Sequence, residues 1–330
     1  MATDGTQTGT LPQNAPGRAF HPTHYLVYGV LCLIWGSTWM AIRVLVRDVP
    51  PLWSAGVRFV IAAALLLLVA AVRGSKAPQG PRQWRAVCVL GLTMIAIPYG
   101  LLFWAEQFVT SSMTAVLYSA LPLCVAALTP WMSRHTVPRQ AIFSMVLGAG
   151  GIGVLFAQGL TATRSTLFGG VAILLAVVST AFSILFAKRE ISAMDPVAST
   201  GWQFLVGAVA LVAGSLATER GRASEWTTHA LIALLFLALV GSAVAFALYY
   251  WLLRHLQPYQ ISTISLVVPI VAIIEGAAIL QEPIPPLMLA ASVAVLGAVA
   301  GVLRAQASEP VILLHSEAEG RGIPTSSEKV

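Results

Sequence analysis

Five ionisable side chains lie inside or at the ends of strongly apolar segments: Arg43, Arg58, Glu106, Glu275 and Glu282. A charge inside a bilayer is unfavourable, so such a residue is expected to face a partner, a substrate or a water-filled path. One hypothesis is an ion-pair gate near the outer side of the membrane, formed by Arg43, Asp48, Arg58, Glu106 and Glu282.

Glu275 is the most individual of these residues. It lies seven residues before Glu282, which places it on nearly the same helix face and about 10 Å deeper. Burial favours the protonated form of a carboxyl group. Glu275 could therefore be a neutral core acid, a partner of Arg58, a proton-coupling site or an anchor for a substrate amine.

Aromatic and hydroxyl side chains at mid-depth could line a cavity for a small molecule. Trp35 lies ten residues into the first apolar segment, about 15 Å deep, where interfacial tryptophans are not expected. Its ring could stack on an apolar or cationic substrate, and helix packing is the alternative. Depth and helix position select the following cavity residues: Trp35, Ser37, Thr38, Trp39, Tyr99, Ser119, Ser183, Tyr249 and Ser265.

Two prolines occupy matching mid-depth positions. Pro122 and Pro269 each lie about 11 residues into an apolar segment. A proline removes a helical hydrogen bond and frees the carbonyl four residues earlier, here that of Tyr118 and of Ser265. The pair could form two related hinges that line the site, or two structural kinks.

Catalytic and metal-binding patterns are absent from the sequence. The six histidines fall in tails, loops or segment ends, and no HExxH pair or Walker A loop is present. The three cysteines lie in apolar runs without metal-ligand spacing. We therefore expect no enzyme, no cofactor and no metal site.

The composition indicates what must position these side chains. Of 330 residues, 57% are hydrophobic and 10% are charged, and the mean hydropathy is +0.81. Soluble domains carry about 25% charged residues. A soluble enzyme, a disordered protein and a secreted disulfide scaffold are thus excluded, and a polytopic helical membrane protein is predicted. The net charge of +6 fits basic cytoplasmic loops, so no nucleic-acid partner is expected.

Ten apolar segments of about 20 residues each are long enough to span a bilayer. They cover residues 25–46, 52–72, 86–106, 111–132, 138–157, 167–187, 197–217, 229–253, 258–280 and 285–304. Residues 1–24 and 305–330 are polar and are predicted to be disordered tails.

Lysine and arginine residues set the orientation. With the N-terminus inside, 13 of the 19 fall on the inside, 5 fall outside, and Arg58 lies within a span. Because cytoplasmic loops are enriched in these residues, both tails are predicted to be cytoplasmic. The expected location is the inner or plasma membrane, crossed many times.

The chain repeats itself weakly. A shift of 147 residues places Trp104 on Trp251 and Pro122 on Pro269. Each half, residues 25–157 and 167–304, holds five predicted spans, and residues 158–166 form an extracytoplasmic linker. Because five is odd, the halves must be inverted relative to one another. We therefore predict an all-α polytopic membrane protein with ten transmembrane helices as two inverted five-helix repeats.

Several motifs resemble one family. The stretch WGSTWMAIR, from Trp35 to Arg43, resembles the first-span signature of the EamA family in the drug/metabolite transporter superfamily. Further similarities are Arg58-Phe59, Ala105-Glu106-Gln107, Pro122, Pro269 and Glu282. The resemblance implies ten helices around a central cavity and the export of metabolites, amino acids or drugs. Two departures are His135, opposite Glu282 in the repeat, and Glu275, where the family is usually apolar.

These observations predict a secondary transporter that works by alternating access through a central cavity. The alternatives are a nucleotide-sugar-type antiporter of the same superfamily and a membrane channel or scaffold without active transport. The expected partners are a small-molecule substrate and the lipid bilayer. A proton as the coupling ion and a homodimer are left open.

Overall fold

The computed structural model describes residues 22–133, 163–190, 194–255 and 264–279, with short pieces between 143 and 150 and between 281 and 298. Predicted spans five and ten, most of the predicted linker and nearly all of both tails lie outside the described ranges. Every regular element in the described ranges is helical.

The helices follow one another along the chain as α1 (Pro22–Asp48), α2 (Pro51–Val72), α3 (Gly80–Leu90), η1 (Gly91–Ala96), α4 (Ile97–Ala105), α5 (Ser111–Tyr118), α6 (Leu121–Ser133), α8 (Arg164–Glu190), α9 (Pro196–Thr218), α10 (Thr228–Leu235), η2 (Phe236–Val244), α11 (Ala245–His255) and α13 (Ile264–Ile279). The two η elements are π-helices that continue the α-helices on either side of them.

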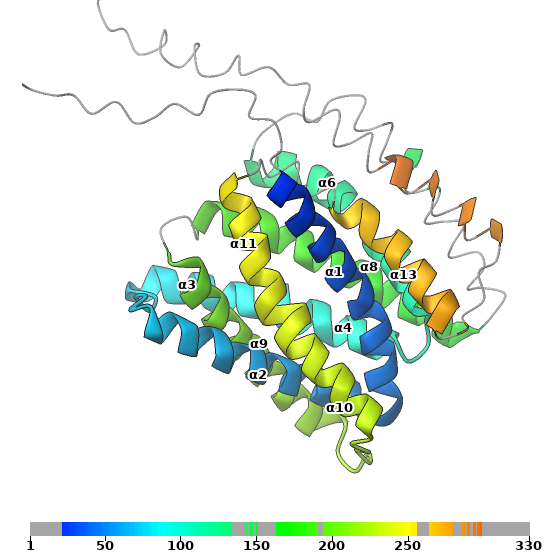
Figure 1. Cartoon of the computed structure of the whole chain (residues 1–330), viewed down its shortest axis with the longest axis horizontal. Helices are drawn as coiled ribbons and strands as arrows, with labels where there is room; N and C mark the ends of the chain where they lie inside the picture. The colour runs from blue at the N-terminus through cyan, green and yellow to red at the C-terminus, as the bar shows by residue number, and fades with distance from the viewer. Residues whose placement is uncertain are drawn as a thin grey trace, which may run out of the picture.

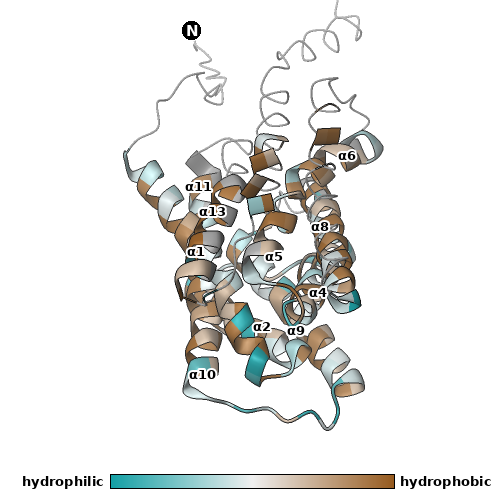
Figure 2. Cartoon of the chain, turned by 90° about the vertical axis from the view of Figure 1, so that its right-hand side faces the viewer, coloured by the Kyte–Doolittle hydropathy of each residue, from teal (hydrophilic) through white to brown (hydrophobic). Residues whose placement is uncertain are grey.

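Seven stretches of the described residues are long and apolar enough to cross a membrane: Pro22–Asp48, Pro51–Val72, Gly80–Ala105, Met113–Met132, Arg164–Ala187, Pro196–Thr218 and Thr228–Tyr249. Large apolar side chains such as Leu68 and Val209 are exposed on their outer faces. Apolar residues predominate along these helices in Figure 2. An apolar exterior suits lipid contact, and the predicted polytopic helical membrane class is confirmed.

Capping side chains define where the helices begin. Asp195 accepts a hydrogen bond from the Ala198 N–H at 2.8 Å at the start of α9, and Thr227 caps α10 in the same way. Glu219 reaches α2 from a distant loop and accepts from the N–H groups of Leu52 and Trp53, both at 3.0 Å. These carboxylate contacts join the end of α9 to the first turn of α2.

Helices of the two halves of the chain pack against each other. α2 and α9 lie side by side over most of their length (Figure 1). α1 lies between α13 and the α10–η2–α11 helix, and α8 packs against α4 and α6. Glycines allow close approach: a methyl group added at Gly36 of α1 would clash with the side chain of Val271 on α13.

Both π-helices use side chains of the opposite half. Ser179 of α8 donates to the Thr93 carbonyl of η1 at 2.6 Å, and Ser183 donates to the Thr93 hydroxyl at 2.7 Å. In η2, the Ser242 hydroxyl donates to the Leu237 carbonyl at 2.9 Å and accepts from Arg58 Nε at 3.1 Å. π-Helices rearrange the backbone hydrogen bonds and are frequent at functional sites.

The two proline positions differ locally. The fourth span is interrupted at Ser119 and Ala120, immediately before Pro122, which begins α6 with Leu121. α13 continues through Pro269 without an interruption. The Ser265 and Pro269 side chains lie outside the described ones, so their hinge and cavity roles stay predictions.

We predict that Gly207→Ala destabilises the fold by about 1–3 kcal/mol through overpacking. The added methyl group would lie 2.5 Å from Ile95 Cγ2 and 2.9 Å from the Gly91 carbonyl oxygen, where α9 meets η1. Unfolding of the purified protein in detergent measures the change. Gly29→Ala is the matched control, because its methyl group meets no described atom within 4 Å. Equal stability of the two variants would contradict this close contact.

Candidate functional site

Trp35 on α1 belongs to an aromatic cluster. Its ring centroid lies 5.4 Å from that of Tyr249 and 6.2 Å from that of Phe246. Phe246 lies 5.2 Å from Phe204, which lies 5.1 Å from Phe59. Phe59 in turn lies 4.6 Å from Tyr99, which completes the cluster of Trp35, Tyr249, Phe246, Phe204, Phe59 and Tyr99. The cluster thus crosses five helices, drawn from both halves of the chain.

Arg58 closes the cluster at the Tyr99 end. Its side chain is 1% exposed, and its Cζ lies 5.0 Å from the ring centroids of both Phe59 and Tyr99. The ring of Phe103 follows at 5.9 Å. Arg58 Nε donates to Ser242, while Nη1 has no hydrogen-bond partner among the described residues. Arg58 is therefore a desolvated cation held among rings.

Glu275 accepts a hydrogen bond from a hydroxyl group, whereas Arg58, one of its predicted partners, donates to Ser242 instead. Ser37 on α1 donates to Glu275 Oε1 on α13 at 2.8 Å. The same Ser37 hydroxyl lies 2.8 Å from the Leu33 carbonyl of its own helix. Glu275 Oε2 is buried and has no hydrogen-bond partner in the described part of the chain. One hydroxyl proton therefore has two acceptors, one of which can itself be protonated.

Trp39 lies one turn after Trp35 and contacts a different helix. It is 7% exposed, and its ring centroid lies 5.2 Å from that of Tyr118 on α5. The Tyr118 hydroxyl is 2.9 Å from the Thr180 hydroxyl on α8. Thr38 bonds to the Trp35 carbonyl at 2.6 Å and lies close to Gly241 of η2. Ser37, Thr38 and Trp39 of α1 thus contact three different helices: α13, η2 and α5, respectively.

The residues of the hypothesised outer gate have several different contacts. Arg43 Nη1 donates to the backbone carbonyl of Glu106, whose side chain is fully buried. Asp48 accepts from the Thr227 hydroxyl at 2.5 Å. No described carboxylate forms an ion pair with Arg58. Glu282 lies outside the described residues, so the five-residue gate stays a hypothesis.

The hydroxyl groups of two further predicted cavity residues, Ser119 and Ser183, form hydrogen bonds with other groups of the protein. Ser119 donates to the Val116 carbonyl at 2.6 Å beside the interruption of the fourth span. Ser183 lies in the contact between α8 and η1. Residues that sequence reasoning missed include Phe204, Phe246 and Ser242. Nothing in their apolar surroundings distinguishes them, because their importance arises from neighbours distant in sequence.

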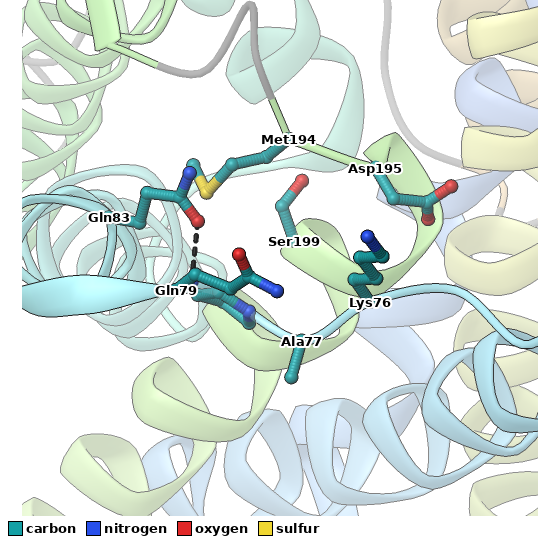
Figure 3. Close-up of a pocket in the computed structure, with 8 residues that line it drawn as sticks. Lys76, Ala77, Gln79, Gln83, Met194, Asp195 and Ser199 are labelled. Atoms are coloured by element: carbon teal, nitrogen blue, oxygen red, sulfur yellow. Dashed lines mark hydrogen bonds between the residues drawn. The ribbon is translucent and has the colours of Figure 1, made fainter.

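A separate polar hollow of about 90 Å³ lies between the α2–α3 connection and the start of α9 (Figure 3). Within it the Gln79 N–H donates to Gln83 Oε1 at 2.6 Å. None of the predicted cavity residues lines it. Its lining is Lys76, Ala77, Pro78, Gln79, Gln83, Met194, Asp195 and Ser199.

Comparison with known proteins gives one consistent family. The EamA-like transporter family matches residues 24–157 and 167–304. The uncharacterized transporter YoaV of Bacillus subtilis is 29% identical over 76% of this chain and 87% of its own length. The uncharacterized inner membrane transporter YedA of Escherichia coli K12 is 30% identical over 74% and 79%, respectively.

A third relative, protein PagO of Salmonella typhimurium, is 24% identical over 75% of this chain and 82% of its own length. A solved crystal structure shares the fold with a TM-score of 0.62 at 16% sequence identity. The alignment covers 87% of this chain and 99% of that one. The fold over most of the chain therefore has an experimental counterpart.

We predict that Ser37 and Glu275 are energetically coupled. Ser37→Ala removes the donor to Glu275 Oε1, and a hydrogen bond to a charged group contributes about 1.5–3 kcal/mol. A double-mutant cycle of Ser37→Ala and Glu275→Ala, which removes the acceptor as well as the donor, measures the coupling from unfolding in detergent. Ser54→Ala is the matched control, because the Ser54 hydroxyl donates to the Pro51 carbonyl of its own helix. Additive effects of the two changes would exclude the coupling.

Proposed function

The chain belongs to the EamA-like transporter family, and from this premise we propose that it is a secondary transporter exporting small organic metabolites, amino acids or drugs by alternating access. It is a membrane transporter, as its relatives are named. The proposed location is the inner membrane, with both tails cytoplasmic. The name of YedA and the distribution of Lys and Arg support this location.

One observation carries the proposal: the two π-helices occupy matching positions and are held crosswise. The shift of 147 residues that superimposes the halves moves Gly91–Ala96 of η1 into η2. Thr93 of η1 is held by serines of the second half, and Ser242 of η2 is held by Arg58 of the first. Each half thus fixes the irregular helix of the other.

Helix contacts support two inverted five-helix repeats, residues 25–157 and 167–304. α1 packs on α13, as α8 packs on α6. α2 packs on η2, as α9 packs on η1. α1 contacts α10 and α11, as α8 contacts α3 and α4. Each contact joins the halves and recurs with the halves exchanged, as expected for repeats that rock against one another.

The aromatic cluster is the proposed substrate wall. Its members come from α1, α2, α4, α9 and α11, so any movement between the halves changes their spacing. Trp35 is only partly buried, whereas Phe59 and Phe204 are fully buried. A ligand that contacts Trp35 and Tyr249 would therefore reach the cluster at its accessible end.

Proton coupling is proposed to use Glu275. When Glu275 is ionised, its Oε1 accepts a hydrogen bond from the Ser37 hydroxyl. When Glu275 is protonated, its own O–H can donate to the Ser37 oxygen while the Ser37 proton turns to the Leu33 carbonyl. Ser37 and Glu275 can thus be hydrogen-bonded in both protonation states of Glu275. Glu275 can take up a proton while the Ser37 hydroxyl keeps a hydrogen-bond partner.

We predict that export depends on Trp35. Cells producing the wild type should accumulate less of at least one compound from a panel of amino acids, their toxic analogues and cationic drugs. Trp35→Ala at matched expression should raise accumulation of that compound by about tenfold or more, the effect of losing about 1.4 kcal/mol of ring contact.

Trp84→Ala provides the control for loss of an aromatic pair. Trp84 contacts Trp202 at a centroid distance of 5.0 Å, and neither of these two rings is a member of the aromatic cluster. Retained export in this variant and lost export in Trp35→Ala are the expected results. Equal export by wild type and Trp35→Ala would remove Trp35 from the substrate wall.

We further predict that Glu275→Gln flattens the pH dependence of export. If inward proton flow drives export, acidifying the outside medium should accelerate the wild type. Glutamine keeps the shape of the side chain but cannot carry a proton. Initial export rates at a series of external pH values measure the effect, with Glu225→Gln on an exposed loop as control. A Glu275→Gln profile that follows the wild type would exclude this residue as the coupling site.

A further inference from the structure

We propose that Arg58 is the receptor for a carboxylate group of the transported molecule. This inference rests on the proposed transport function and narrows the substrate to organic carboxylates that carry an apolar or aromatic part. Arg58 lies seven residues into α2, about 10 Å along the helix axis from its first residue. It therefore lies within the span and away from the aqueous end.

Burial leaves the charge of Arg58 uncompensated. The side chain is 1% exposed, and within the described ranges no carboxylate lies at ion-pair distance. Its contacts are the Ser242 hydroxyl and three ring faces. Ring faces attract a cation but do not neutralise it. A buried cation of this kind inside a membrane marks a substrate or ion path.

The hydrogen-bonding capacity of Arg58 is also incompletely used. Nε donates to Ser242, and Nη1 has no described acceptor. A guanidinium group presents its donors as a planar fork that matches the two oxygens of a carboxylate. Gly241 marks a close approach beside the guanidinium group, since a methyl group there would lie 3.8 Å from Arg58 Nη2 and 2.9 Å from Thr38 Cγ2. The donor that stays available to a ligand is Nη1, which no described acceptor contacts.

The surroundings favour an organic anion over an inorganic one. Phe59, Tyr99 and Phe103 contact the guanidinium group, and Phe59 continues through Phe204 to Phe246 and Trp35. A small hydrated ion such as chloride gains nothing from rings. A molecule with a carboxylate at Arg58 and an apolar body along the aromatic cluster would use both features.

A purely structural role explains only part of the geometry. Arg58 Nε fixes Ser242 in η2, which accounts for one donor. A residue needed only for that bond would not have to keep Nη1 buried without a described acceptor. The carboxylate role and the structural role predict different ligand responses, so binding separates them.

The test measures how ligands raise the unfolding temperature of the purified full-length protein in detergent. The probes are 3-phenylpropionate, its neutral amide 3-phenylpropanamide, acetate and chloride. A ligand that binds only the folded state raises the unfolding temperature with concentration, which yields an apparent Kd. We expect 3-phenylpropionate to bind most tightly, acetate more weakly, and the amide and chloride to give no shift.

Variants locate the response. Arg58→Gln should weaken 3-phenylpropionate binding by about ten- to a hundredfold, the equivalent of one charge-assisted hydrogen bond. Arg58→Lys keeps the charge but loses the planar fork, and should weaken binding by about tenfold; it serves if Arg58→Gln does not fold. Arg82→Gln, which removes a 75% exposed arginine, should bind as the wild type does.

Three results would overturn the proposal. They are an amide response equal to that of the carboxylate, a response to chloride alone, and wild-type binding in both Arg58 variants. The first two need only the wild type, so they hold even where a variant fails to fold. Trp35-dependent export by a protein that binds no carboxylate would reject this inference alone. Carboxylate binding by a protein that exports neither a panel compound nor 3-phenylpropionate would reject the proposed transport function.

Discussion

The bilayer requires that every polar group within it be satisfied by the protein itself, and the rest of this structure depends on that constraint. Most hydroxyl groups meet it locally, as when Thr93 and Thr180 bond to carbonyls of their own helices. Several groups do not meet it completely, and among them Arg58 and Glu275 each keep a buried atom without a described partner. In a membrane interior, a buried polar atom without a hydrogen-bond partner is a favourable place for a ligand or a proton to bind.

The π-helices follow from the same constraint. A π-turn shifts the backbone pairing, and the carbonyl or hydroxyl it rearranges must find a new partner from another helix. For Thr93 the partners are Ser179 and Ser183, and for Ser242 the partner is Arg58. Because each partner belongs to the other half of the chain, the hydrogen bonds of each π-helix also join the two halves.

The sequence predicted what depends on length and hydropathy, and it was less informative about which side chains meet. The seven described spans, the helical class and the family followed from apolar segment length and motifs. The partner of Glu275 did not: Arg58 was one predicted alternative by charge, yet Ser37 lies against the carboxylate. In a helix that is apolar on every side, no periodicity shows which face points toward which neighbouring helix. The sequence therefore could not predict that Trp35 and Trp39 contact different helices. The role of Ser242 depends on the π-helix η2 and on Arg58, which is distant in sequence, so no local pattern predicts it.

α1 lies against the surroundings of both Arg58 and Glu275. Ser37 binds Glu275 on α13, while the next residue, Thr38, lies against Gly241 beside Arg58. Consecutive helical residues point about 100° apart, so α1 touches both sites on different faces. A carboxylate that enters beside Arg58 presses on the Thr38 side, and any resulting shift of α1 acts on the Ser37–Glu275 bond. On the proposed assignments, substrate and proton are thus coupled through one rigid helix, without a direct contact between the two charges.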